Sequence, residues 1–273
     1  MPNVIQEAIA IESRGRRLVG FWHGGAGPRT GAAVVFCHPL FEEKKSSHRV
    51  LVETARHMAA RGIAVLRFDL SGCGDSPGEF DEVSLPDWID DVQAALQAAA
   101  RRAPEAELGL LGLRFGAALA AEVAERTRDL GSLILWEPVL RGQDYIAADL
   151  RKKLIKEMMT HGRATQSRRE LMERLEGDAT IDFDGFPVTS RLYKDLAGLQ
   201  LDGPKTYGGR LLIVQVGPRD EVSGGLREFG STYAGGRVDL LAARELPFWN
   251  LIGLVECPGL MAKTTDWLLT RKP

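Results

Sequence analysis

The sequence has few cysteines, no excess of either charge and no long hydrophobic run. Its cysteines, Cys37, Cys73 and Cys257, are odd in number and far apart, which excludes a disulfide framework and a paired-cysteine zinc site. The 35 basic and 37 acidic residues nearly balance, which argues against nucleic acid as a partner. The first residues lack a signal's apolar segment, and no run approaches the ~20 residues that span a bilayer. We therefore expect a cytoplasmic protein without a membrane span.

The remaining composition is that of a folded globular chain. Of the 273 residues, 44% are hydrophobic and 26% charged, which excludes extensive disorder or a collagen-like chain. The length suits one large α/β domain with an insertion. No repeat or low-complexity tract is found, and we expect neither a metal ion nor a cofactor.

Short apolar runs alternate with segments of helical spacing. Val4–Ile11 and Leu18–Trp22, around a turn at Ser13, predict an antiparallel hairpin. The later strands are predicted at Ala33–Cys37, Ile63–Phe68, Leu108–Leu111, Leu133–Trp136, Leu211–Val216 and Val238–Ala242. The helices between them are predicted at Val50–Ala60, Leu85–Arg102, Arg114–Glu125 and Pro258–Thr270. This order predicts an α/β fold with a mostly parallel central sheet, helices on both faces, and a ligand at the carboxyl ends of the strands.

The alternation breaks over residues 141–205. A basic helical segment, Leu150–Met159 continuing through Arg168 and Arg169, precedes a β-like piece at Thr180–Val188. We predict a helical cap here, inserted into an α/β core formed by residues 1–140 and 206–273. Its basic residues are either a solvated helix face or a surface that attracts anionic ligands. They are Arg151, Lys152, Lys153, Lys156, Arg163, Arg168 and Arg169.

One short motif indicates the particular α/β fold. Gly112-Leu113-Arg114-Phe115-Gly116 follows a predicted strand and opens an apolar helix, which is the context of the G-x-S-x-G nucleophile elbow. Upstream, His38-Pro39 ends the first core strand where an oxyanion-hole loop lies, and Asp69–Ser76 ends the next strand. The order and spacing of these features predict an α/β-hydrolase fold, with arginine at the position of the nucleophile.

The rest of a catalytic triad is incomplete in the sequence. An α/β hydrolase supplies serine, then an acid, then histidine along the chain. Asp220 stands at the usual acid position, and Glu137 at the other position from which the acid can come. The base should follow Val238–Ala242, yet the last histidine of the sequence is His161. The serine and the histidine of the triad are therefore both missing, which argues against ordinary serine-hydrolase activity.

Arginine at the elbow favours binding over nucleophilic chemistry. Its guanidinium stays protonated, so it is neither nucleophile nor base, but it is a fixed cation at a helix N-terminus that already favours an anion. We therefore predict a site for a small anionic or polar molecule. Its candidate residues are Arg114, Phe115, His38, Glu42, Asp69 and Glu137.

Two other interpretations remain open. Arg114 can pair internally and fill the substrate space, leaving a non-catalytic scaffold or interaction protein; the candidate partners are Glu42, Asp69, Glu137 and Asp220. Alternatively, the protein is a hydrolase or acyl transferase acting on an ester, thioester or amide by a non-standard mechanism. His38 or a carboxylate would then activate water while Arg114 holds an oxyanion.

Several blocks of the sequence resemble one family. They are His38–Arg49, Asp69–Phe80, Gly112–Ala117 (GLRFGA), Leu135–Gly142 and Pro247–Asn250. Together they resemble the exosortase-system-associated hydrolases of the second type, bacterial members of the α/β-hydrolase superfamily. That family also carries arginine at the elbow, whereas Leu40 and Ser47-His48 differ from its usual form. The resemblance implies the fold and the hydrolase name, and it implies no particular substrate.

Overall fold

A mixed β-sheet forms the centre of the molecule. The computed structural model describes residues 5–24, 30–163 and 166–270. Within this part of the chain the large sheet has eight strands, in the order β1-β2-β4-β3-β5-β6-β9-β10. They are β1 (Ile5–Ser13), β2 (Arg16–Gly24), β3 (Ala32–Cys37), β4 (Ala64–Phe68), β5 (Glu107–Leu113), β6 (Ser132–Trp136), β9 (Arg210–Gly217) and β10 (Arg237–Arg244). The strands from β4 to β10 run parallel, while the β1–β2 hairpin joins β4 antiparallel.

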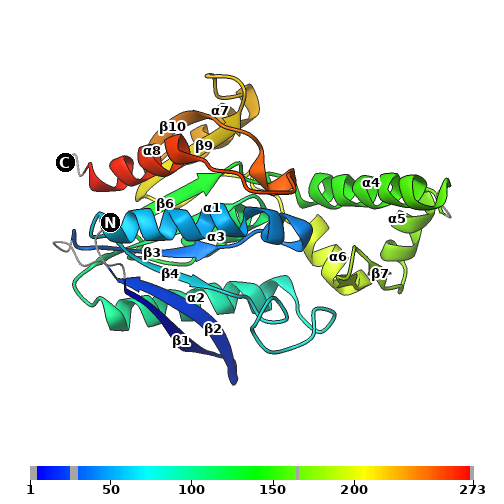
Figure 1. The fold of residues 1–273 in the computed structure, drawn as a ribbon, viewed down its shortest axis with the longest axis horizontal. Helices are drawn as coiled ribbons and strands as arrows, with labels where there is room; N and C mark the ends of the chain where they lie inside the picture. Colours follow the sequence, from blue (N-terminus) through cyan, green and yellow to red (C-terminus); the bar gives the residue numbers. More distant parts are fainter. Residues whose placement is uncertain (1–4, 25–29, 164–165, 271–273) are drawn as a thin grey trace.

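Helices cover both faces of this sheet (Figure 1). They are α1 (Phe41–Ala60), α2 (Leu85–Arg102), α3 (Phe115–Ala124), α7 (Gly224–Ser231) and α8 (Pro258–Leu269), with a 3-10 turn, η1 (Phe248–Asn250). Successive residues of a strand point to opposite faces of the sheet, and they pack in two separate apolar cores. Val35 packs in the core of α2, α3 and α7, and its neighbour Phe36 packs in the core of α1 and α8. Burial on both sides explains why these strands are continuous apolar runs. The predicted α/β-hydrolase architecture is confirmed.

The observed bounds of the helices and strands agree with the predicted bounds in some elements and differ in others. α2 has the predicted bounds, since Ser84 and Asp87 close a capping box at its start. The predicted hairpin is confirmed over the described residues, with Val4 lying outside them. The predicted start of α1 at Val50 is wrong, because the helix begins at Phe41. Its first turns bury Glu43 and Ser47, polar residues that an apolar pattern cannot reveal.

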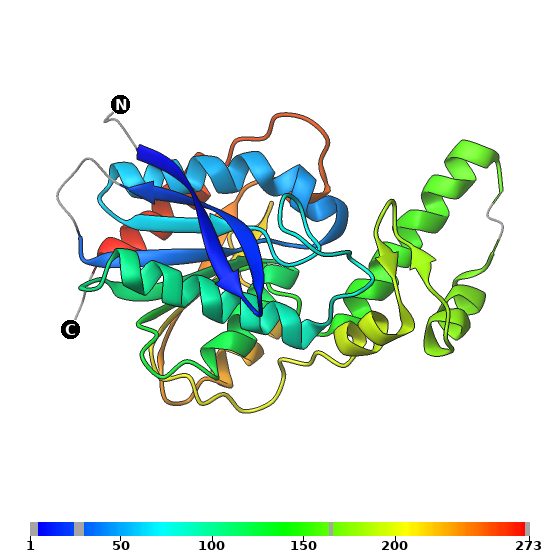
Figure 2. The ribbon, with the colours of Figure 1, turned by 90° about the horizontal axis from the view of Figure 1, so that it is seen from below.

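An insertion between β6 and β9 projects from one end of the molecule (Figure 2). It contains α4 (Gly142–His161), α5 (Arg168–Glu176), β7 (Ile181–Asp182), β8 (Pro187–Val188) and α6 (Ser190–Ala197). The predicted basic helical segment is divided between two helices, because α4 ends at His161, with Gly162 as its C-cap at a left-handed φ of 70°, and α5 begins at Arg168. The β-like piece at Thr180–Val188 is the β7–β8 hairpin, and α6 was not predicted.

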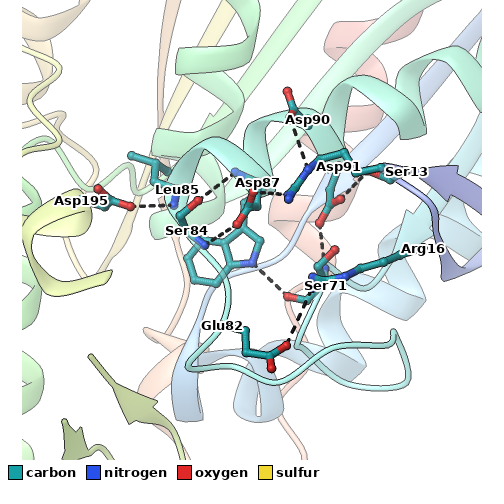
Figure 3. Close-up of polar contacts among 12 residues, drawn as sticks. Ser13, Arg16, Ser71, Glu82, Ser84, Leu85, Asp87, Asp90, Asp91 and Asp195 are labelled. Atoms are coloured by element: carbon teal, nitrogen blue, oxygen red, sulfur yellow. Dashed lines mark hydrogen bonds and ion pairs between the residues drawn. The ribbon is translucent and has the colours of Figure 1, made fainter. Parts of the chain in front are cut away.

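Buried polar contacts fix the loop that follows β4 (Figure 3). Asp91 of α2 accepts hydrogen bonds from Ser13 Oγ at 2.6 Å and from the Ser71 backbone N–H at 2.8 Å. Trp88 donates from its indole nitrogen to the Ser71 carbonyl at 3.0 Å. At the start of α2, the Leu85 N–H donates to Asp195 of α6 at 3.2 Å, which ties the insertion to the core. The Asp69–Ser76 loop is thus held from β1 and α2.

Among the described residues, no helix combines the length and the apolar composition needed to cross a bilayer.

Candidate functional site

The turn between β5 and α3 has the geometry of an elbow. Arg114 lies at its apex with φ 56° and ψ −118°, an unfavourable backbone conformation for a residue other than glycine. A Cβ atom on Gly112 would lie 2.3 Å from the Gly116 carbonyl oxygen, and one on Gly116 would lie 2.1 Å from that of Cys37. The two glycines of the motif therefore permit the close approach of β3, β5 and α3 that forms the turn.

The Arg114 side chain has partners on three sides. Its Nε lies 3.4 Å from Glu43 Oε1, and its Nη1 donates to the Glu137 carbonyl oxygen, also at 3.4 Å. Its Cζ lies 5.3 Å from the centre of the Trp249 ring, within the range of a cation–π contact. Even so, 22% of the side chain stays exposed. Arg114 is therefore paired internally, with a carboxylate outside the predicted set of partners.

Glu43 is the centre of a buried charged cluster. Its side chain is only 2% exposed, and it also accepts a hydrogen bond from the Tyr145 hydroxyl at 3.3 Å. Lys152 Nζ lies 3.5 Å from Glu43 and 2.9 Å from Asp149. Burial raises the pKa of Glu43, against the opposing effect of Arg114 and Lys152. Burial also raises the pKa of Tyr145 well above its ordinary value, so its phenol remains a donor.

A cavity of about 1000 Å³ opens beside Arg114. Arg114 and Tyr145 form part of its wall, with Val139, Leu140 and Phe229 as apolar neighbours. Its other lining residues are Pro138, Arg141, Asp144, Ala148, Asp202, Pro204, Gly225, Glu228, Ser231, Thr232 and Ala234. Arg141 lies 3.4 Å from Asp202 in an ion pair. This mixture of apolar surface and a few polar groups is typical of a small-molecule site.

Three of the predicted residues lie near the elbow but away from this cavity wall. Phe115 is fully buried, with its ring 5.9 Å from that of Trp88 and 6.0 Å from that of Tyr145. Glu137 has φ 45°, and its carboxylate accepts from the Val216 N–H at 2.8 Å while burial raises its pKa. Glu42 is exposed on α1. Of these three residues, Glu137 is the one that accepts a hydrogen bond from the Arg114 guanidinium among the described residues, and it does so through its backbone carbonyl oxygen.

Asp220, which the sequence predicts at the acid position of a triad, is exposed. Its nearest ionic partner among the described residues is Arg244, at 3.8 Å. Neither residue lines the cavity beside Arg114. The loop thus carries a carboxylate in the expected order, but its charge faces a surface arginine.

His38 and Asp69 belong to a second, smaller cavity of about 200 Å³. Burial, reinforced by Lys44, lowers the pKa of His38 to about 3, so its ring is neutral at ordinary pH. The buried Nδ1 of His38 has no hydrogen-bond partner among the described residues. Burial opposes ionisation of Asp69, but Lys44 at 2.7 Å and the Asp75 N–H outweigh it and lower its pKa. Of the predicted ligand residues, Arg114 therefore lines the large cavity, whereas His38 and Asp69 line the small one.

In the part of the chain that the structure describes, no three histidine, cysteine, aspartate or glutamate residues lie close enough together to hold a metal ion.

Sequence reasoning missed Glu43, Tyr145 and Trp249 at the elbow. Glu43 directly follows Glu42, and an earlier start of α1 would have placed it on the buried side of that helix. Trp249 is buried, as tryptophan residues of a core commonly are. No sequence signal distinguishes a core tryptophan from one that also faces a guanidinium.

The sheet order, the parallel core and the elbow after β5 define the class of α/β hydrolases. The chain belongs to the serine aminopeptidase, S33, family, whose profile matches residues 28–180. A comparison with curated proteins gives no match.

Solved structures share the fold at low sequence identity. Est1E from Butyrivibrio proteoclasticus with bound ferulic acid is 17% identical, with a TM-score of 0.68 over 96% of this chain and 98% of that one. Mouse α/β hydrolase domain-containing protein 10 is 18% identical, with a TM-score of 0.59 over 97% and 98%. An α/β serine hydrolase homologue from Coxiella burnetii is 18% identical, with a TM-score of 0.57 over 100% and 99%. At such identities the likeness concerns the fold alone.

Proposed function

We propose that this α/β-hydrolase-fold protein binds a small anionic or polar molecule at Arg114 and is not a serine hydrolase. Arginine stands where the nucleophile is expected, and the stretch after β10, Glu245–Asn250, contains no histidine to act as the base. Without that pair, attack on an ester or amide loses the activation that a triad supplies. The elbow instead presents a permanent cation.

The observation that carries the proposal is the place of Arg114 on the wall of the large cavity. Its two hydrogen bonds are both 3.4 Å long, and Nη2 has no hydrogen-bond partner among the described residues. Phe115 and Gly116 occupy the first two positions of α3, where a helix leaves its N–H groups without intrahelical acceptors. A guanidinium and a helix N-terminus together favour an anion.

A ligand at Arg114 would compete with Glu43, the internal partner of the guanidinium. Glu43 is shared among Arg114, Lys152 and Tyr145, so its charge is not dedicated to the guanidinium. A ligand carboxylate or phosphate that accepts from Nη2 would add charge-assisted hydrogen bonds, each worth roughly 1.5–3 kcal/mol. The apolar side chains of Val139, Leu140 and Phe229 on the same wall favour a carboxylate with a hydrocarbon body.

Titration calorimetry with acetate, benzoate and inorganic phosphate tests this site. We expect the wild type to bind at least one of these anions, with benzoate above acetate, and Arg114→Ala to lose that binding. Arg141→Ala is the matched control, since Arg141 lies on the same wall but is paired with Asp202. Equal binding by wild type and Arg114→Ala would show that the elbow arginine is structural and the protein a scaffold.

A second candidate function rests on the contact between the buried Glu43 carboxylate and Arg114, with Oε1 3.4 Å from Nε, and burial also raises the pKa of Glu43. A buried carboxylate with a raised pKa beside a cation is suited to general-base chemistry, with Arg114 holding the oxyanion. The reaction would be hydrolysis or acyl transfer of an ester, thioester or amide. Turnover of such a substrate that Glu43→Gln abolishes, while binding is retained, would establish this function instead of simple binding.

The proposal also covers the family of the protein, its location in the cell and the role of residues 141–205. We place the protein with the exosortase-associated hydrolases on its GLRFGA block, Gly112–Ala117, and in the cytoplasm, because its three cysteines are free and buried. We also propose that residues 141–205 cap the large cavity, since Arg141, Asp144, Tyr145 and Ala148 lie on its wall. Hydrogen exchange should then slow in α4 when an anion binds. The presence of exosortase genes next to the gene of this protein tests the family assignment. Fractionation of cells that contain the native protein tests the cytoplasmic location.

A further inference from the structure

The outer part of α4 extends beyond the body of the protein. Its buried residues all lie between Gly142 and Leu150, and of the apolar residues beyond them only the partly buried Leu154 packs against the core in the described part of the chain. In Figure 1 these turns point away from the sheet and reach one end of the long axis of the molecule. A helix in this position is free to meet a surface that the rest of the molecule does not touch.

Large apolar side chains are exposed on these turns. Ile155 is 50% exposed, Met158 56% and Met159 83%. Their spacing of three and four residues places them on one face of the helix. Apolar residues exposed singly are common, but three neighbours on one projecting helix form a patch that favours contact with an apolar phase.

Basic side chains outnumber acidic ones in the segment that carries this apolar face. Residues 151–169 contain seven basic side chains and one acidic one, Glu157. Lys152, Lys153, Lys156 and Arg169 have carboxylate partners. Arg151, Arg163 and Arg168 are exposed and have no ion pair among the described residues. We call Arg151, Ile155, Met158, Met159, Arg163 and Arg168 the α4 tip.

We propose that the α4 tip docks on an anionic lipid surface. Two attractions hold an amphipathic helix at a membrane. Its apolar side chains enter the boundary between headgroups and acyl chains, and flanking arginines contact anionic headgroups. The tip has both and projects far enough to reach a plane. The contact is peripheral and reversible, because three apolar side chains with a few charges give only weak anchoring.

The same charges disfavour the other occupants. In a symmetric contact between two copies of this chain, the unpaired arginines of one tip would face those of the other. A stable interface with a folded protein covers about 800 Å² on each partner, which a single projecting helix end does not readily supply. The anionic bilayer is the occupant that matches both the apolar face and the cationic border.

Docking would bring the large cavity close to the lipid. Tyr145 lines the cavity and lies on the same helix as Met158, and thirteen residues of α helix correspond to about 20 Å. A membrane contact at the tip would therefore position the elbow near the surface without inserting it. The docking itself stands independently of any ligand at Arg114.

Vesicle co-sedimentation tests the proposal. The full chain is mixed with vesicles of phosphatidylcholine alone or of phosphatidylcholine with about 30% phosphatidylglycerol. We expect binding to the anionic vesicles only, weakened by salt because the arginine contribution is screened. Replacing the apolar face through Ile155→Ser, Met158→Ser and Met159→Ser should reduce the partition coefficient about tenfold or more. Thermal unfolding should be unchanged, since these side chains are exposed.

A matched control separates the tip from general hydrophobicity. Ile252 and Leu254 are also fully or largely exposed, but on the loop before α8, and Ile252→Ser with Leu254→Ser should leave vesicle binding intact. Failure of the wild type to bind, equal binding to neutral vesicles, or an equal loss in the control would overturn the proposal. A wild-type dimer that the triple variant converts to a monomer in light scattering would assign the tip to self-association instead.

Discussion

Arg114 Nε lies 3.4 Å from Glu43 Oε1, so the side chain at the apex of the elbow is held by a buried carboxylate of α1. Glu43 is in turn shared with Tyr145 and Lys152 of α4. The elbow and the insertion are thereby linked through one acidic group. A change at Glu43 should therefore alter both the charge of the elbow and the attachment of α4.

The first prediction concerns covalent reactivity. A fluorophosphonate probe should label no serine stoichiometrically, and short-chain nitrophenyl esters should be turned over only at background rate. The physical reason is that Arg114 can neither attack nor accept a proton. Intact-protein mass spectrometry gives the labelling directly. One serine labelled per chain would contradict the proposed function.

The second prediction is that Arg114→Ser alone will not create an efficient esterase. The elbow would regain a hydroxyl, but His38 lies in a separate cavity with its pKa lowered to about 3. A serine without an adjacent base falls several orders of magnitude below a triad enzyme. The measurement is kcat/KM on nitrophenyl esters, and a rate near that of natural esterases would reveal a base already in place.

The third prediction concerns competition at the elbow. Glu43→Gln removes the carboxylate that partly neutralises Arg114 and Lys152, so benzoate or phosphate should bind up to about tenfold more tightly. Glu42→Gln changes the same charge on the exposed neighbouring position of α1 and should leave affinity unchanged. Calorimetric titration of both variants distinguishes a local effect from a change in overall charge. Unaltered affinity in Glu43→Gln would place the anion elsewhere.

The fourth prediction addresses the packing of the turn. In Gly116→Ala the new Cβ would lie 2.1 Å from the Cys37 carbonyl oxygen and 2.5 Å from that of His38, so backbone must shift. We expect the free energy of unfolding to fall by about 3 kcal/mol or more. Gly224→Ala is the control, because no atom lies within 4 Å of the Cβ added there, and it should be neutral or stabilising by about 0.5 kcal/mol. Urea unfolding of the two variants gives the comparison.

The fifth prediction is a pH dependence of stability due to His38. Its ordinary pKa is 6.5, whereas burial and then Lys44 lower it to about 3 in the folded protein. Between these values the unfolded chain binds more protons, so stability rises with pH up to about 6.5 and is lost as pH falls. His38→Asn should reduce that slope by about 1.4 kcal/mol per pH unit between pH 4.5 and 6. Parallel slopes for variant and wild type in urea unfolding would contradict this origin.

The sheet and the elbow could be predicted because their determinants are local. Each parallel strand is a short apolar run bounded by breaking residues, and Gly112 and Gly116 mark a turn that only small residues permit. The start of α1 could not be predicted in the same way. Glu43 is buried there by Tyr145 and Lys152, about a hundred residues later in the sequence. Contacts between residues so far apart in the sequence produce no periodic pattern of apolar residues from which a helix could be predicted.

The candidate site was only partly predictable for a related reason. Arg114, His38 and Asp69 all follow strands that end at one edge of the sheet, which correctly suggested proximity. The orientation of each side chain decides which cavity it lines, and that depends on neighbours such as Lys44 and Trp249. The order of the motifs therefore predicts the edge where the chemistry lies, but not its division into two cavities.

The backbone at residue 114 has a consequence for how this position can vary. A φ of 56° with ψ of −118° costs of order 1–3 kcal/mol for any residue with a Cβ atom, whichever side chain it carries. The surrounding glycines and strands impose that conformation without reference to the guanidinium. The backbone of the elbow is therefore independent of the side chain at position 114. Variants with different residues at 114 should adopt the same fold, with the glycine variant the most stable, and should differ mainly in the ligands that they bind.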